Sequence, residues 1–323
     1  MRGIPMEVVG IDVPCVDLLV HVDRLPRENE GARLLEYSWQ GGGKVATALV
    51  ALARLGVKTG IIGVVGECPY GRFCNDDFIL HGVDVSRLII DKNGETPFSL
   101  VISENQKNGR SIIYHRGTVR ELLTEDLDYS YIVSAKYLHL AGVTAATRQA
   151  AIWAKERGVK VVFDADDFNS RILEMVPLID VFIGSEFCYN SMFDDRNYET
   201  NCLKIMERGP GIVVFTFGER GCIGMDGDGF FMEPAFSVPV KDTTGAGDVY
   251  HGAFIYGLLQ GWGTRDTARF ANAVAAIKCT RIGGRAGIPT LDMVKEFLKT
   301  GRIDFEELDR RVEFYGKPRI MRV

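Results

Sequence analysis

Strand patterns and helix patterns alternate along most of this chain, and that alternation restricts the fold more than any other feature. Short runs rich in β-branched residues occur in MEVVGIDV, TGIIGVVG, KVVFDAD, DVFIGS and GIVVFTFG. Between them lie the helical patterns ATALVALARLG, AATRQAAIWAKERG and NCLKIMERG, which end at Gly56, Gly158 and Gly209, as helix C-termini often do. The alternation predicts an α/β protein whose mostly parallel sheet carries helices on both faces.

Two segments interrupt this alternation. Residues 17–40 and 96–117 have the pattern of antiparallel strands, and Asn108-Gly109 in the second segment suits a hairpin turn. We expect them to form a small β appendage inserted into a single α/β domain of residues 1–323. Because an isolated pair of strands is marginal in water, the appendage should serve as a lid over a pocket at the carboxyl edge of the sheet, as a dimer surface, or as both.

Composition excludes several classes of function. The 323 residues, 46% of them hydrophobic, provide enough apolar material for one large core. The net charge of −5 and the pI near 5.7 argue against a protein that binds nucleic acid or an anionic membrane. The apolar runs are shorter than the roughly 20 residues that span a bilayer, and the first residues lack a signal-peptide pattern. We therefore expect a cytoplasmic protein.

Neither the cysteines nor the histidines form a motif. The seven cysteines contain no C-x-x-C pair, and the five histidines are dispersed. This spacing predicts reduced thiols and gives no support for a zinc site or a Ser-His-Asp triad.

The stretch VKDTTGAGDVYHGAF carries the most specific chemistry. After a strand-like run, FSVPV, it places Gly245, Ala246 and Gly247 before a helix expected from Val249 onward, so that backbone N–H groups converge as an anion site. The spacing fits neither a Walker A loop nor a dinucleotide fingerprint. Asp248 is then either a first-turn acid that satisfies N–H groups, or a general base beside a transferring phosphoryl group. Spacing alone leaves both readings open.

Four stretches together resemble the ribokinase-like, or PfkB, carbohydrate kinases. DTTGAGDVYHGA is similar to that family's C-terminal signature and GGGKVATALVALARLG (41–56) to its N-terminal one. Residues 63–86 resemble its G-x-x-G-x-D-x-x-G segment, and residues 216–229 resemble its nucleotide-side strand and hairpin. They occur in the expected order as far as about residue 290. The segment KCTRIGGRAGIP (278–289) looks most like the branch that contains sulfofructose kinase.

The resemblance implies a fold and a set of site residues. The fold would be a ribokinase-like doubly wound sheet with a small β lid, and the cosubstrate and metal would be ATP and Mg²⁺. Asp248 would be the catalytic base, with residues 245–247 as the anion hole. The residues implied to bind substrate are Asp17, Gly42, Gly43 and Lys44, and those implied to line the nucleotide groove are Thr216, Gly218, Gly221 and Asn272. Asp242 and Thr244 match positions that bind a monovalent cation in many members, and whether this chain needs potassium is left open.

The chain also departs from the family pattern. Thr47 stands where Asn is usual, and the magnesium-associated N-x-x-E motif appears as SEFC at 185–188. Glu186 could hold the magnesium water shell from a shifted position, and Asp164 and Asp166 are candidates for the same task. In the expected lid, Arg116, next to His115, is either a reader of an anionic sugar or a solvated charge.

The leading hypothesis is an ATP-dependent kinase that phosphorylates a hydroxyl of a small sugar, keto-sugar or sugar acid. Two alternatives are a catalytically silent sugar- or nucleotide-binding protein of the same fold, and a nucleoside kinase. The expected partners are the small-molecule sugar and a second copy of the chain in a homodimer, with no nucleic acid and no membrane.

Overall fold

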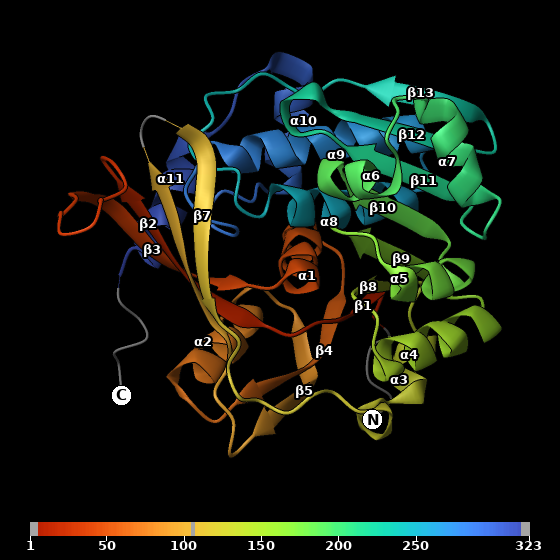
Figure 1. Ribbon diagram of the computed structural model, residues 1–323, viewed down its shortest axis with the longest axis horizontal. Coiled ribbons are helices and arrows are strands. Elements are labelled where there is room, and N and C mark those ends of the chain that lie inside the picture. Colours follow the sequence, from red (N-terminus) through yellow and green to blue (C-terminus); the bar gives the residue numbers. More distant parts are fainter. Residues whose placement is uncertain (1–5, 105–106, 318–323) are drawn as a thin grey trace.

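The computed structural model describes residues 6–104 and 107–317 and contains two β-sheets (Figure 1). The large sheet has the strand order β13-β12-β11-β10-β9-β8-β1-β4-β5. Its strands are β1 (Val8–Ile11), β4 (Thr59–Gly66), β5 (Asp84–Asp91), β8 (Tyr137–Ala141), β9 (Lys160–Ala165), β10 (Val181–Ser185), β11 (Ile212–Thr216), β12 (Cys222–Asp226) and β13 (Gly229–Glu233). Neighbouring strands are parallel from β11 to β5, and β12 and β13 form an antiparallel hairpin at one edge.

Helices cover both faces of this sheet, which explains why its strands are apolar throughout. Val8 enters one hydrophobic core and Val9 the other, and Ile61 and Ile62 divide in the same way, because successive side chains of a strand point to opposite faces. The first core contains residues of α1 (Lys44–Arg54), α2 (Pro69–Leu80), α8 (Ala246–Leu259), α9 (Thr264–Cys279), α10 (Leu291–Thr300) and α11 (Phe305–Tyr315). The second contains residues of α3 (Tyr129–Val133), α4 (Ala145–Glu156), α5 (Ser170–Met175), α6 (Glu186–Met192) and α7 (Tyr198–Met206). The predicted α/β architecture is confirmed.

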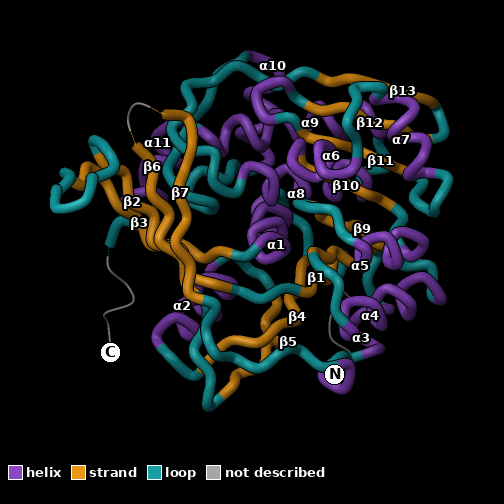
Figure 2. The backbone as a smooth tube through the Cα atoms, viewed as in Figure 1, coloured by secondary structure: helices purple, strands orange, loops and turns teal. Residues whose placement is uncertain are grey.

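The small sheet stands at the side of the large one (Figure 2). Its order is β3 (Leu34–Gly42), β2 (Cys15–Val22), β6 (Phe98–Glu104) and β7 (Lys107–His115), so it joins two segments that are far apart in the sequence. The pairs β2/β3 and β6/β7 are antiparallel, whereas β2/β6 is parallel. One row across β2, β6 and β7 consists of Asp17, Ser99 and Tyr114, and the next row, Leu18, Leu100 and Ile113, faces the opposite way.

Three local expectations differ from the structure. Asn108-Gly109 is not the hairpin turn, because both residues lie within β7 and the connection falls at 105–106, outside the described residues. The run FSVPV is not a strand: residues 234–240 have no regular structure, and Pro234 and Pro239 cannot donate to a ladder. Helix α8 begins at Ala246, three residues before the expected Val249.

Two wider expectations concern thiols and membranes. All seven cysteines are free, as predicted. In the described part of the chain, no helix combines the length and the apolar character needed to cross a bilayer.

Candidate active site

The predicted catalytic residues meet at the carboxyl edge of the parallel strands, where ligands of doubly wound sheets bind. Asp164 lies near the end of β9, and Ser185 and Thr216 end β10 and β11. Lys44, the first residue of α1, forms an ion pair with Asp166 just beyond β9, with 2.5 Å between Nζ and Oδ2. This pair brings the glycine-rich start of α1 to the strand ends.

The glycine turn before α8 has the geometry of an anion site. Gly245 is the N-cap residue and has a left-handed conformation with φ of +73°, which favours glycine. The N–H of Ala246 is already used by the carbonyl of Thr243 at 3.1 Å. Within the described residues, the N–H groups of Gly245, Gly247 and Asp248 have no hydrogen-bond partner, as is usual at the start of a helix. Two of the three residues expected to form the anion hole therefore keep an unused donor, and Asp248 adds another.

Asp248 belongs to a group of acids gathered around Lys44. Burial, together with the charges of Asp164 and Asp166, raises the pKa of Asp248 well above its ordinary value, and Lys44 opposes that rise. Burial also raises the pKa of Asp164, to about 6, again against the effect of Lys44. A carboxylate whose pKa is raised toward neutrality is suited to accept a proton.

Two buried histidines lie beneath these acids, and sequence reasoning did not select them. The rings of His139 and His251 stack with 5.5 Å between centroids, and Nε2 of His251 is 3.5 Å from Oδ1 of Asp164. Burial lowers the pKa of His139 to about 4 and that of His251 to about 3. Both rings are therefore neutral at pH 7 and add no charge to the site. The position of His251, three residues after Asp248 in α8, was the sequence signal that could have identified it.

The residues expected to bind substrate lie together at the junction of the small sheet and α1. Gly42 packs against Asp17: an added Cβ would lie 2.4 Å from Oδ2 of that carboxylate. Gly43 has a φ of +95°, and its Cβ would lie 2.8 Å from Oδ2 of Asp12. That oxygen accepts the N–H of Ala46 at 2.8 Å, so Asp12, also overlooked in the sequence, caps α1 from the end of β1.

The basic residues of β7 and its end divide between two environments. His115 stacks on Phe98, with 5.6 Å between ring centroids, on the face opposite to Asp17. The guanidinium of the exposed Arg116 lies over the ring of Tyr114, at 5.9 Å. Arg110, on the same face of the strand as Tyr114, donates to Oγ1 of Thr243 at 3.5 Å.

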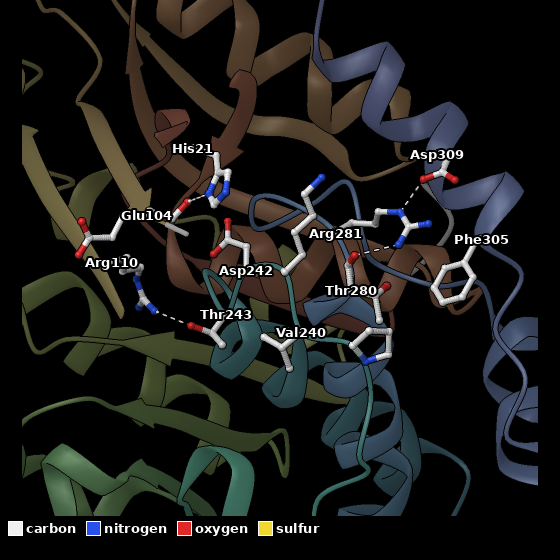
Figure 3. Close-up of a pocket in the computed structure, with 13 residues that line it drawn as sticks. His21, Glu104, Arg110, Val240, Asp242, Thr243, Thr280, Arg281, Phe305 and Asp309 are labelled. Carbon is white, nitrogen blue, oxygen red and sulfur yellow. Dashed lines mark hydrogen bonds and ion pairs between the residues drawn. The ribbon is translucent and has the colours of Figure 1, made fainter. Parts of the chain in front are cut away.

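Arg110 also lines a cavity of about 730 Å³ between the small sheet and the body (Figure 3). Asp242 and Thr243, which lead into the glycine turn, form part of its wall, and Arg281 and Asp309 form an ion pair at 2.6 Å along its far side. The cavity is therefore adjacent to the anion site but is lined by charges of both signs.

The nucleotide-side residues predicted from the sequence surround the end of β11 and the hairpin that follows. Thr216 ends β11 and donates to the carbonyl of Gly184 at 3.5 Å. Gly218 and Gly221 have φ values of +58° and +87°, and a Cβ on Gly221 would collide with the carbonyl oxygen of Glu233, at 2.1 Å. Both glycines are therefore required by the backbone.

Asn272 has a different environment from the one expected. The side chain is buried in α9, and its amide donates to the carbonyls of Glu233 and Pro234 at 3.2 and 3.1 Å. These bonds fasten the β12–β13 hairpin to α9. A direct contact between Asn272 and the nucleotide stays a prediction.

The residues proposed to hold magnesium lie in two different environments. Among the described residues, no group of three or more His, Cys, Asp or Glu side chains is arranged to ligate a metal directly. Glu186 is paired with Arg220. The three acids Asp164, Asp166 and Asp248 instead lie around a single lysine, Lys44. This excess of negative charge fits a Mg²⁺ ion that reaches the site on ATP phosphates and keeps its waters.

A buried lysine lies beside Asp242, one of the two residues proposed to bind a monovalent cation, and the other, Thr244, has a buried hydroxyl without a partner among the described residues. Lys278 is fully buried in α9, and its Nζ donates to the carbonyl oxygen of Asp242 at 2.9 Å. The carboxylate of Asp242 accepts the N–H groups of Thr244 and Gly283, each at 2.8 Å. Burial alone would raise the pKa of Asp242. Lys278 and the two N–H donors have the larger opposite effect, so the pKa lies below its ordinary value. An ammonium group thus already neutralises this position.

Comparison with known proteins identifies the family of this chain. The model of the family described as pfkB family carbohydrate kinase matches residues 7–291. The 5-dehydro-2-deoxygluconokinase of Clostridium perfringens is 30% identical over 298 residues, covering 84% of this chain and 87% of that protein. The enzyme of the same name from Geobacillus kaustophilus is 29% identical over 322 residues, covering 92% and 95%.

Solved structures show the same fold. Ribokinase from Thermotoga maritima superposes with a TM-score of 0.80 at 24% identity, over 91% of this chain and all of that one. Ribokinase of Arabidopsis thaliana, solved with ribose and ATP, has a TM-score of 0.79 at 23% identity, over 92% of this chain and 99% of that one.

Proposed function

This chain belongs to the pfkB family of carbohydrate kinases and is an ATP-dependent sugar kinase, and from that premise we propose its acceptor and the roles of its residues. The acceptor is 5-dehydro-2-deoxygluconate or a related keto-sugar acid, phosphorylated on a primary hydroxyl. Asp248 is the base, and the N–H groups at the start of α8 receive the transferring phosphoryl group.

The observation that carries the proposal is the pairing of Asp248 with unused N–H donors in one turn. The raised pKa of Asp248 equips its carboxylate to take the acceptor's hydroxyl proton as the oxygen attacks the γ-phosphorus. The N–H groups of Gly247 and Asp248, at the positive end of a 14-residue helix, stabilise the negative charge on the phosphoryl oxygens.

Lys44 and the neighbouring acids complete the electrostatics. Lys44 favours the ionised form of the acid cluster, since its charge opposes the rise in the pKa of both Asp164 and Asp248. Mg²⁺, when bound, offsets the charge of the ATP phosphates, and Asp164 and Asp166 are the residues that would face its water shell.

The acceptor class follows from the relatives together with the sugar-facing side of the small sheet. A sugar acid carries several hydroxyls and one carboxylate, so it requires both polar backbone contacts and a cation. Asp17 and the backbone at Gly42 and Gly43 provide the polar contacts to the hydroxyls. Arg116 and Arg110, neither of which has a carboxylate partner in the described chain, provide candidates for the cation.

The test is ADP release from ATP and Mg²⁺ across matched acidic and neutral sugars. We expect turnover with keto-sugar acids at a kcat/KM at least tenfold above that with their neutral analogues. Arg116→Ala and Arg110→Ala, made separately, assign the carboxylate: the arginine that contacts it should raise KM for the acid about tenfold or more and leave the neutral sugar unaffected. Turnover confined to nucleosides would overturn the proposed acceptor, and equal effects on both sugars would overturn the anion contact.

A further inference from the structure

Behind the glycines of the proposed sugar site lies a buried ionic network, formed by Arg285, Asp77 and Tyr315, that the reaction described above does not use. Arg285 is fully buried and is the largest such side chain among the described residues. Its Nη2 donates to the carbonyl oxygen of Gly42 at 3.0 Å, and its Nη1 forms an ion pair with Asp77. One guanidinium therefore joins α2 to the backbone that faces the sugar.

The backbone of the same segment is fixed to β3 as well. Gln40 accepts the N–H groups of Arg285 and Ala286 at 2.7 and 3.0 Å, and its amide donates to the carbonyl of Ile282 at 2.9 Å. Gly41 leaves the space that the guanidinium occupies, since an added Cβ would lie 1.9 Å from Nη1. Of the three consecutive glycines, the first accommodates Arg285, the second approaches Asp17, and the third adopts a positive φ.

The last helix closes the network from the other side. The hydroxyl of Tyr315, the final residue of α11, donates to Oδ1 of Asp77 at 2.7 Å. Arg311, one turn earlier, donates to the carbonyls of Arg285 and Ala286 at 2.8 and 3.0 Å. The family model ends its match at residue 291, so α11 lies beyond the matched segment and still contacts both the backbone of Arg285 and its ion-pair partner Asp77.

We propose that Arg285 is a positioning residue for the acceptor sugar, held in place by Asp77 and by Tyr315 of α11. It orients the carbonyl of Gly42 and places a fixed positive charge behind Asp17, and this role rests on the proposed use of Asp17 and Gly42 as sugar contacts. The charge reaches that carboxylate: burial raises the pKa of Asp17, and Arg285 opposes the rise. By opposing that rise, Arg285 favours the ionised form of Asp17, which is the stronger acceptor for a sugar hydroxyl.

The mildest test is Tyr315→Phe, which removes one hydroxyl and keeps the ring. We expect KM for the acceptor to rise about threefold to tenfold, with KM for ATP and kcat within twofold, because only the sugar-facing backbone loses support. Arg285→Lys keeps the charge but loses the forked geometry that serves Asp77 and Gly42 at once, so a larger rise in the same KM is expected.

Tyr131→Phe is the matched control. Tyr131 donates to Oδ1 of Asp84 at 2.8 Å, the same type of bond at a position distant from the glycines, and its loss should lower Tm without changing any KM. If Tyr315→Phe lowers Tm as the control does and leaves the acceptor KM unchanged, the network is purely structural and the inference fails. If the wild type itself turns over no sugar, the proposed function fails instead, so the two failures are distinct. If Tyr315→Phe does not fold, Arg285→Lys decides the question by the same ratio of acceptor KM to ATP KM.

Discussion

At the scale of single residues, Asp248 carries the sharpest prediction. Asp248→Asn keeps the size of the side chain but removes the proton acceptor, so kcat should fall by about 10²- to 10⁴-fold. ATP affinity should stay the same or improve, because one negative charge leaves the phosphate site. Steady-state kinetics of the variant check both expectations.

Asp266→Asn is the control for this substitution, since Asp266 is an exposed acid in the first turn of α9. It should leave kcat unchanged.

The stability of Asp248→Asn gives a second readout. A carboxyl whose pKa is raised in the folded state stabilises the fold below its ordinary pKa and loses that contribution as pH rises through the folded value. Asp248→Asn should therefore melt about 2 °C above the wild type at pH 8, and a near-normal kcat in this folded variant would make Asp248 a structural cap.

Lys44 yields a prediction about pH. The proposed base would work only when ionised, so we expect activity to rise with pH through the pKa of Asp248. Burial and the neighbouring acids raise that pKa, and Lys44 opposes the rise. Lys44→Met removes that opposition and should move the acidic limb of kcat/KM upward by about one pH unit. Lys136→Met, which breaks an exposed pair with Glu7, is the control, and an unmoved limb in Lys44→Met would show that Lys44 does not tune the base.

Residue identities at the site were partly predictable from the sequence. The turn at residues 245–248 could be recognised from its own spacing, and the resemblance to the kinase family added Lys44 and the glycines at 42–43. Arg285 and Asp77 are separated by 208 positions, and Tyr315 and Asp77 by 238. No local pattern reports such a contact, because it exists only once three distant elements have packed together.

At the scale of elements, the small sheet shows what periodicity can and cannot predict. The alternation of residues 17–40 and 96–117 predicted strands, and the structure forms strands there. The prediction of a hairpin turn at Asn108-Gly109 was wrong. The register of β6 and β7, with Ser103 opposite Arg110, overrides the local preference of Asn-Gly for a turn. Only pairing with β2 fixes that register.

The outward face of this sheet leads to a prediction about assembly. Leu35, Tyr37 and Ile113 are exposed by 42%, 39% and 62% on the face opposite to Asp17. An exposed apolar sheet face of this kind is typical of an interface, and we expect two copies to pair through it. Light scattering should give twice the chain mass of 35.8 kDa.

The substitution that tests the pairing is Ile113→Lys, which should give a monomer by placing a charge in the apolar contact. Ile79→Lys alters an equally exposed isoleucine on α2, at 56% exposure, and should leave the mass unchanged. A wild type that is monomeric at micromolar concentration contradicts the expectation.

At the scale of the whole molecule, the buried ammonium of Lys278 predicts indifference to potassium. Its Nζ occupies the carbonyl oxygen of Asp242 and neutralises the turn that leads into the anion site. Replacing Na⁺ with K⁺ should therefore change kcat less than twofold and Tm by less than about 1 °C. A K⁺-dependent rise in either quantity would mean that a cation binds beside Lys278.

Lys278→Met gives the converse measurement. The substitution removes a buried hydrogen bond to the carbonyl oxygen of Asp242 and the positive charge that favours the ionised Asp242 carboxylate, which costs about 1–3 kcal/mol of folding free energy. The variant should melt well below the wild type in either salt. An unchanged melting temperature would show that Lys278 does not neutralise this turn.

The position of β7 at the edge of the small sheet has a consequence for how the acceptor specificity of such an enzyme can change in evolution. Within β7, Ile112 and Tyr114 lie on the same face of the small sheet as Asp17 and are exposed by 49% and 62%, so replacing them costs the fold little. The glycines at 41–43 have no such freedom, since each would meet a neighbouring side chain if it gained a Cβ. Evolution toward a new acceptor therefore has an open route along one strand, while the backbone that would contact the sugar at residues 41–43 is held by steric necessity.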